Sequence, residues 1–188
     1  MLQVDEQQCT VKSVNVRAEQ HGDRPVPACD VGILFETGCE VLDLFEEGLK
    51  DAFYTKDKKV QKPLPGTDDA VKGPRLRFNG KIGDLGINWE GIGYKAALTW
   101  GDMAGSVDVK LSAITVAKVK AELTDGGTVG LSLQLQCHPK QEHYGELASL
   151  IGREGVSLTL TPPTATELKK IEKSEKKKDG KKDDDAGK

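Results

Sequence analysis

The stretch that decides the fold is Val116–Cys137, VAKVKAELTDGGTVGLSLQLQC. Its first arm alternates apolar residues with lysine, glutamate and threonine, and its second arm has an apolar residue at every second position from Val129 to Cys137. Asp125-Gly126-Gly127 separates the arms, where a tight reversal needs residues that accept positive φ. Because successive side chains of a strand point to opposite faces, this pattern predicts a β-hairpin with one buried face.

The same alternation recurs along the chain and predicts further strands at 10–18, 29–36, 107–111 and 156–161. The glycine-rich segment 75–101 changes its apolar phase at Glu90-Gly91, which requires a bulge or a tight turn. Strands that follow one another and are joined by turns favour antiparallel pairing. The predicted fold is therefore α+β and β-rich, an antiparallel β-sandwich or partly open barrel of about nine strands with two helices.

Two segments have helical spacing instead. Apolar residues recur every three or four positions over 41–53, and Gly48 weakens that helix by about 1 kcal/mol relative to alanine. A second helix is expected after Pro139, with Gly152 or Gly155 at its end. The segment 55–74 has three prolines and many charges, which predicts a long exposed loop, either a tolerated insertion or an arm that orders on a partner.

Charge is unevenly distributed along the chain. Residues 164–188 carry 9 lysines and 7 acids, whereas the remaining residues carry 18 basic and 23 acidic side chains, a net charge of −5. An acidic body argues against sequence-independent duplex binding, but leaves open a local basic groove or an acidic surface for a basic partner. We predict a single β-rich domain over 1–163 and a charged tail over 164–188, with a nascent helix near 165–177 followed by disorder.

Catalytic and metal-binding patterns are weak. The four cysteines are far apart and form no CxxC pair, which favours reduced thiols over a disulfide framework or a zinc site. The chain has no GxSxG elbow and no phosphate loop, so we predict a non-enzymatic protein with no catalytic residues, no metal and no cofactor. The N-terminus MLQVDEQQCT lacks the basic and apolar regions of a signal peptide, and no apolar run suits a membrane helix, so a cytoplasmic protein is expected.

One constellation suggests binding. Four aromatic and four basic residues lie close in sequence, and we predict that they form a nucleic-acid site: Arg75, Arg77, Phe78, Lys81, Trp89, Tyr94, Lys95 and Trp100. Single-stranded nucleic acid binds where bases stack on aromatic rings and cations follow the backbone. The alternative is that the two tryptophans and the tyrosine belong to the core, because each falls in an apolar phase.

The chain also resembles a family of uncharacterised proteins from bacteriophages and prophages, often encoded near recombination and replication genes. The resemblance covers about residues 8–163 and lies in VKSVNVRAEQHGDRPVPACDVGILFE, INWEGIGYKAALTWG and LQCHPKQEHYGELASLIGREGVSLTLTPP. The resemblance assigns no functional residue to this chain. It implies a phage protein in the cytoplasm of the bacterial host, acting in DNA metabolism or against host defence.

The expected function is that of a phage accessory protein that binds single-stranded DNA or a recombination or replication protein. The alternative is an inhibitor of a bacterial defence system, anti-CRISPR or similar, that binds its protein target through an acidic surface. A third possibility is a virion structural protein.

Overall fold

The structure, a computed structural model, describes residues 1–21, 24–55, 73–78, 83–101 and 106–171. These residues form nine strands: β1 (Val4–His21), β2 (Arg24–Gly38), β3 (Tyr54–Thr55), β4 (Arg75–Leu76), β5 (Leu85–Ile87), β6 (Gly91–Trp100), β7 (Val107–Leu123), β8 (Thr128–Cys137) and β9 (Val156–Thr161). They also form a 3-10 helix, η1 (Cys39–Leu44), and the helices α1 (Leu49–Phe53) and α2 (His143–Ser149). Residues 165–171 are helical as well. No helix in the described ranges combines the length and apolarity needed to cross a membrane.

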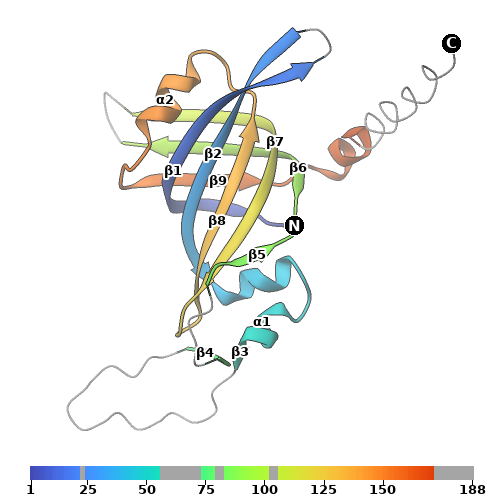
Figure 1. The fold of residues 1–188 in the computed structure, drawn as a ribbon, viewed down its shortest axis with the longest axis vertical. Coiled ribbons are helices and arrows are strands. Elements are labelled where there is room, and N and C mark those ends of the chain that lie inside the picture. Colours follow the sequence, from blue (N-terminus) through green and yellow to red (C-terminus); the bar gives the residue numbers. More distant parts are fainter. Residues whose placement is uncertain (22–23, 56–72, 79–82, 102–105, 172–188) are drawn as a thin grey trace, which may run out of the picture.

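Six strands close into an antiparallel barrel. Their order is β7-β6-β9-β1-β2-β8, and β8 pairs with β7 again to complete the ring (Figure 1). Strand β5 adds to β7, and β3 and β4 form a separate two-stranded sheet. The β-rich, antiparallel prediction is confirmed. The sandwich alternative is wrong, because β8 pairs with both β2 and β7 and leaves one ring instead of two stacked sheets.

The predicted hairpin over Val116–Cys137 is confirmed, and it consists of the second half of β7 and the whole of β8. All apolar positions of the second arm, from Val129 to Cys137, are buried inside the barrel. The first arm belongs to a longer strand than predicted, because β7 continues from Val107 through the phase shift near residue 113. Ala113 and Lys118 have φ of 54° and 52°, so single residues in left-handed conformation reverse the inward face without ending the strand.

The predicted helix over 41–53 is divided in two. Cys39–Leu44 is a 3-10 helix, and Leu49–Phe53 is a separate short α-helix. Between them Gly48 has φ of 82°, a left-handed conformation that interrupts the helix and that glycine adopts without a steric penalty. Leu42 is fully buried, so η1 covers the barrel interior as the helix was expected to do.

The first two strands extend past the barrel. Strand β1 starts six residues before the predicted strand, and its register with β2 shifts between Val11 and Ser13. Beyond this bulge the predicted inward phase fails, and Val16 is 62% exposed. Figure 1 shows this end of the hairpin projecting beyond the other strands. Helix α2 and the residue that follows it cover the interior with Leu147 and Leu150, both fully buried.

The start of the predicted tail is attached to the barrel. Thr164 and Glu167 form a reciprocal cap, in which the Thr164 N–H donates to Oε2 of Glu167 at 2.8 Å and the Glu167 N–H donates to Oγ1 of Thr164 at 3.4 Å. Glu167 also accepts a hydrogen bond from Nζ of Lys95 on β6 at 2.8 Å. Residues 172–188 lie outside the described ranges, and so do residues 56–72 of the predicted loop.

Candidate functional site

The structure divides the described members of the predicted aromatic and basic cluster among four places. Tyr94 is 2% exposed and lies in the core, so its ring is not available to stack a base, which corrects the prediction for this residue. Trp89 packs edge-on against the rings of Tyr94 and Phe45, with centroid distances of 6.1 and 5.3 Å. The core alternative left open by the sequence therefore describes both residues.

Trp100 lies at the end of β6 and is half-buried. Its Nε1–H donates to the carbonyl of Glu154 at 2.9 Å. The guanidinium of Arg153 lies 4.0 Å from the ring centroid, a cation–π contact that covers one face of the indole. A base would have to displace this guanidinium to stack on that face.

Three members of the cluster, Arg75, Arg77 and Phe78, are on and just after β4. The Arg77 Nε–H donates to the carbonyl of Tyr54 at 3.1 Å, and Phe78, 51% exposed, tilts against Phe53 with a centroid distance of 6.2 Å. Arg75 is also exposed, whereas Lys95 is on β6 and forms an ion pair with Glu167. Lys81 lies outside the described residues.

These places do not make one surface. The β3–β4 sheet lies against the turn that follows β7, where the amide of Leu76 donates to Oδ1 of Asp125 at 3.0 Å. Trp100 instead pairs with Val107 at the other end of β7. A strand of 17 residues spans on the order of 50 Å at about 3.3 Å per residue, so Phe78 and Trp100 lie at opposite ends of the barrel.

A different site lies where β1 and β2 part. Strand β1 changes its partner along its length: Val4–Cys9 pairs with β9, and only from Thr10 onward does it pair with β2. The ladder between the two strands ends at Thr10 and Leu34, after which β2 pairs only with β8 among the described strands. The two strands therefore border an opening in the wall of the barrel, which we call the seam groove.

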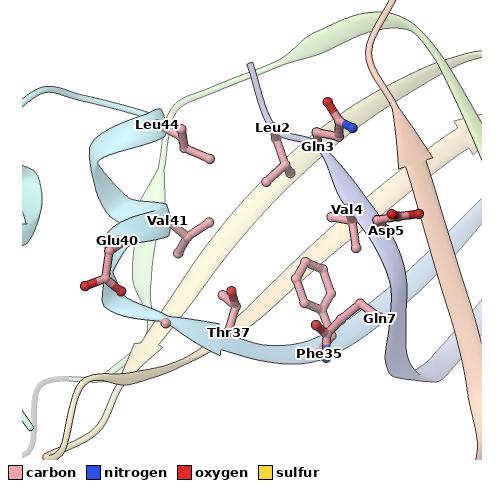
Figure 2. A pocket seen from close by; sticks show the side chains of 11 residues that line it. Leu2, Gln3, Val4, Asp5, Gln7, Phe35, Thr37, Glu40, Val41 and Leu44 are labelled. Atoms are coloured by element: carbon pink, nitrogen blue, oxygen red, sulfur yellow. The ribbon is translucent and has the colours of Figure 1, made fainter.

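The seam groove consists of two hollows that share Gln7 and Phe35. The first, of about 400 Å³, lies between the start of β1, the end of β2 and η1. The second, of about 380 Å³, continues along both strands to Glu154 and Gly155. Figure 2 shows the first hollow, with the side chains of Leu2, Val41 and Leu44 directed into the space between β1 and η1.

The floor of the groove is apolar and its rim is acidic. Leu2, Val4, Phe35 and Val41 are buried, and Leu44 is 47% exposed. The acidic residues that line the two hollows are Asp5, Glu36, Glu40 and Glu154, and no described lysine, arginine or histidine lines them.

Two lining side chains have shifted pKa values. Glu40 accepts a hydrogen bond from Nζ of Lys50 at 2.9 Å, which lowers the pKa of this carboxyl and neutralises its charge locally. Cys9 is buried, and desolvation raises the pKa of its thiol to about 11, so the thiol is protonated at neutral pH. Within the part of the chain that the structure describes, no ion pair involves Asp5, Glu36 or Glu154, so the remaining negative charge of the groove lies on these three residues.

The seam groove was not predicted. The composition of the N-terminal residues indicates only a polar segment without signal-peptide character, although Leu2 and Val4 alternate with polar residues in the manner of a strand. That alternation is the one local signal, and it would have added a strand without revealing where β1 leaves β2. Among the described residues, no three His, Cys, Asp or Glu side chains are grouped so that they could hold a metal ion.

Comparison with models of protein families, with curated proteins and with solved structures found no match to this chain.

Proposed function

We propose that this chain is a non-enzymatic accessory protein, of the bacteriophage setting that its sequence resembles, and that it binds a protein partner through the seam groove. The observation that carries the proposal is the end of the β1–β2 ladder at Thr10 and Leu34, beside an apolar floor and an acidic rim. The partner is a recombination or replication protein. The alternative partner, a bacterial defence complex, would use the same groove.

The shape of the groove supports a protein ligand. The two hollows share the lining residues Gln7 and Phe35 and follow one another along β1 and β2, so the concave surface is longer in the strand direction than either hollow alone. The partly exposed side chain of Leu44 adds apolar surface at one end. Apolar surface bordered by polar residues and a strand without a lateral partner are both features of surfaces that bind polypeptide.

The proposal is tested with the full chain as bait in a lysate of the bacterial host. A captured partner is then purified and titrated against the wild type, the double variant Glu36→Lys/Glu154→Lys, and the control Glu142→Lys. Glu142 is an exposed acid at the start of α2 and does not line the groove. We expect the double variant to lose at least tenfold in affinity and the control to keep wild-type affinity. Equal affinity for all three proteins would overturn the proposal.

The identity of the partner separates the two settings. A recombinase, a helicase or another protein of DNA replication as the groove-dependent partner would support the first. A nuclease or another component of a defence complex would support the alternative. The same double variant and the same control are used with either partner, so the titration shows in each case whether the partner binds through the groove.

A second candidate function, binding of single-stranded DNA, is favoured by the half-exposed ring of Phe78 beside Arg75 and Arg77. A base stacked on an aromatic ring contributes about 1–3 kcal/mol. Fluorescence anisotropy with labelled oligonucleotides at low and physiological salt tests this function, with Phe78→Ala as the variant. Salt-sensitive binding that Phe78→Ala weakens would support it. An absence of salt-sensitive binding at micromolar protein would exclude it.

A further inference from the structure

We infer that the seam groove receives an extended segment of its partner in which lysine or arginine alternates with apolar residues, and that this segment adds as a strand to the edge of β2. The inference rests on the proposed function and specifies the chemistry of its ligand. In such strand addition, main-chain hydrogen bonds supply affinity, and pockets for alternate side chains supply specificity.

The main chain of β2 is oriented for a further strand. The Cys39 N–H donates to the carbonyl of Gly127 at 2.8 Å, and β2 pairs with β8 without a register shift up to Gly38. Cys39 and Gly127 continue this register, and hydrogen-bonded pairs recur at every second residue of an antiparallel ladder. The main-chain groups of the odd-numbered residues of β2 therefore form hydrogen bonds with β8. Because the direction of main-chain groups alternates along a strand, the N–H groups of Glu36 and Gly38 point to the groove.

Strand β1 on the other side does not offer an equivalent edge. Its register with β9 shifts between Val4 and Gln7, and Glu6 has φ of 44°. An irregularity of this kind disrupts the regular spacing of main-chain donors and acceptors. A ligand strand would therefore pair with β2, while β1 forms the opposite wall.

The side chains around the edge determine what the ligand carries. Phe35 points inward and is buried, whereas Glu36 is exposed on the outer side of the same strand. An added strand has the same alternation, so its inward residues would contact the apolar floor beside Phe35 and Leu44. Its outward residues would lie beside Glu36, with Glu154 and Asp5 further along the rim, where cations are favoured.

Synthetic peptides and the full chain test the inference directly. The probe is a fluorescein-labelled nonapeptide in which every second residue is lysine and the residues between the lysines are valine or threonine. Its matched control has glutamate in place of each lysine. We expect salt-sensitive binding of the lysine peptide and at least tenfold weaker binding of the glutamate peptide. Two further peptides are N-methylated at the odd or at the even positions. An added strand directs only one of these two sets of amides at β2, so one methylated peptide should lose binding and the other should keep it.

A variant of the protein removes one main-chain donor from the groove. Gly38 has φ of −74° and ψ of 154°, which proline adopts, so Gly38→Pro removes its N–H without changing the backbone. In either Gly38→Pro or Gly38→Ala the new Cβ would lie 2.6 Å from Oε2 of Glu40, the movable end of a side chain, so Gly38→Ala is the matched control. Loss of one hydrogen bond should weaken the lysine peptide about three- to tenfold in the proline variant relative to the alanine variant.

The possible results separate this inference from the proposed function. If the lysine peptide binds and both methylated peptides bind equally well, strand addition is overturned. If no peptide binds although the purified partner still loses affinity for Glu36→Lys/Glu154→Lys, the basic extended ligand is overturned and the protein-binding function stands. If the purified partner binds that double variant like the wild type, the proposed function fails. The peptide comparisons need no variant, so they hold even if Gly38→Pro does not fold.

Discussion

Replacement of Trp89 by alanine tests whether this residue belongs to the core, as its packing indicates. Its ring contacts Phe45 and Tyr94, with centroid distances of 5.3 and 6.1 Å. Truncation of a fully buried tryptophan costs about 3–5 kcal/mol, and since Trp89 is only partly buried we expect a loss of about 2–3 kcal/mol in the free energy of unfolding. For a protein of this size such a loss lowers Tm by about 5–10 °C.

Urea unfolding followed by circular dichroism measures this loss, with Phe78→Ala as the matched control. Among the described residues Phe78 has one ring contact, and it is half exposed, so its truncation should cost less than about 1 kcal/mol. If Trp89→Ala unfolds at the same urea concentration as the wild type, its side chain contributes no packing energy. In that case the assignment of Trp89 to the core is wrong, and its place in a binding surface must be considered again.

Three further predictions concern the backbone, the attached helix and the thiols. Gly48→Ala should destabilise the protein by about 1 kcal/mol in urea unfolding, because φ of 82° strains a residue with a Cβ; an unchanged midpoint would contradict the break between η1 and α1. The hydrogen bonds of Lys95 and Thr164 lower the pKa of Glu167 from 4.5 to about 2, so the contribution of this contact is complete above pH 4.5 and is lost as the pH falls toward 2. In an NMR titration Lys95→Ala should raise the pKa of Glu167, and an unchanged value would refute the ion pair. Burial raises the pKa of Cys137 to about 12, so iodoacetamide at pH 8 should modify it more than tenfold faster in urea than in the native protein, and equal rates would contradict its burial.

The local elements of the fold were predictable because their signals are local. The apolar residues at every second position from Val129 to Cys137 are all buried and form the inward face of β8. The phase shift before Val116 also has a local cause, but the sequence could not distinguish a strand end from a residue such as Ala113 in left-handed conformation within one strand. The same reasoning applies to Gly48, which was expected to weaken a helix and instead separates two short ones.

Closure of the barrel and the seam groove depend on pairings between distant residues. Cys29 lies opposite Cys137, more than a hundred positions later, and nothing in either segment specifies the other as its partner. The groove requires that β1 pair with β9 before Thr10 and with β2 after it, a change that hydrophobic alternation alone does not encode.

The prediction of the aromatic and basic cluster failed for the opposite reason, because its residues are close in sequence and far apart in space. Residues 75–100 are close in sequence, but β6 alone carries Tyr94 into the core and Trp100 to the far end of the barrel. Nearness along the chain implies nearness in space across a turn but not along an extended strand, which rises about 3.3 Å per residue.

The measurement that most directly tests the seam groove as the binding site is amide hydrogen exchange, resolved by residue, in the full chain with and without the lysine nonapeptide. We predict slower exchange of the Glu36 and Gly38 amides in the complex, with no change at Arg77 or Phe78. Unchanged exchange at Glu36 and Gly38, with slowing confined to Arg77 and Phe78, would contradict this account and move the binding site to the β3–β4 end of the molecule.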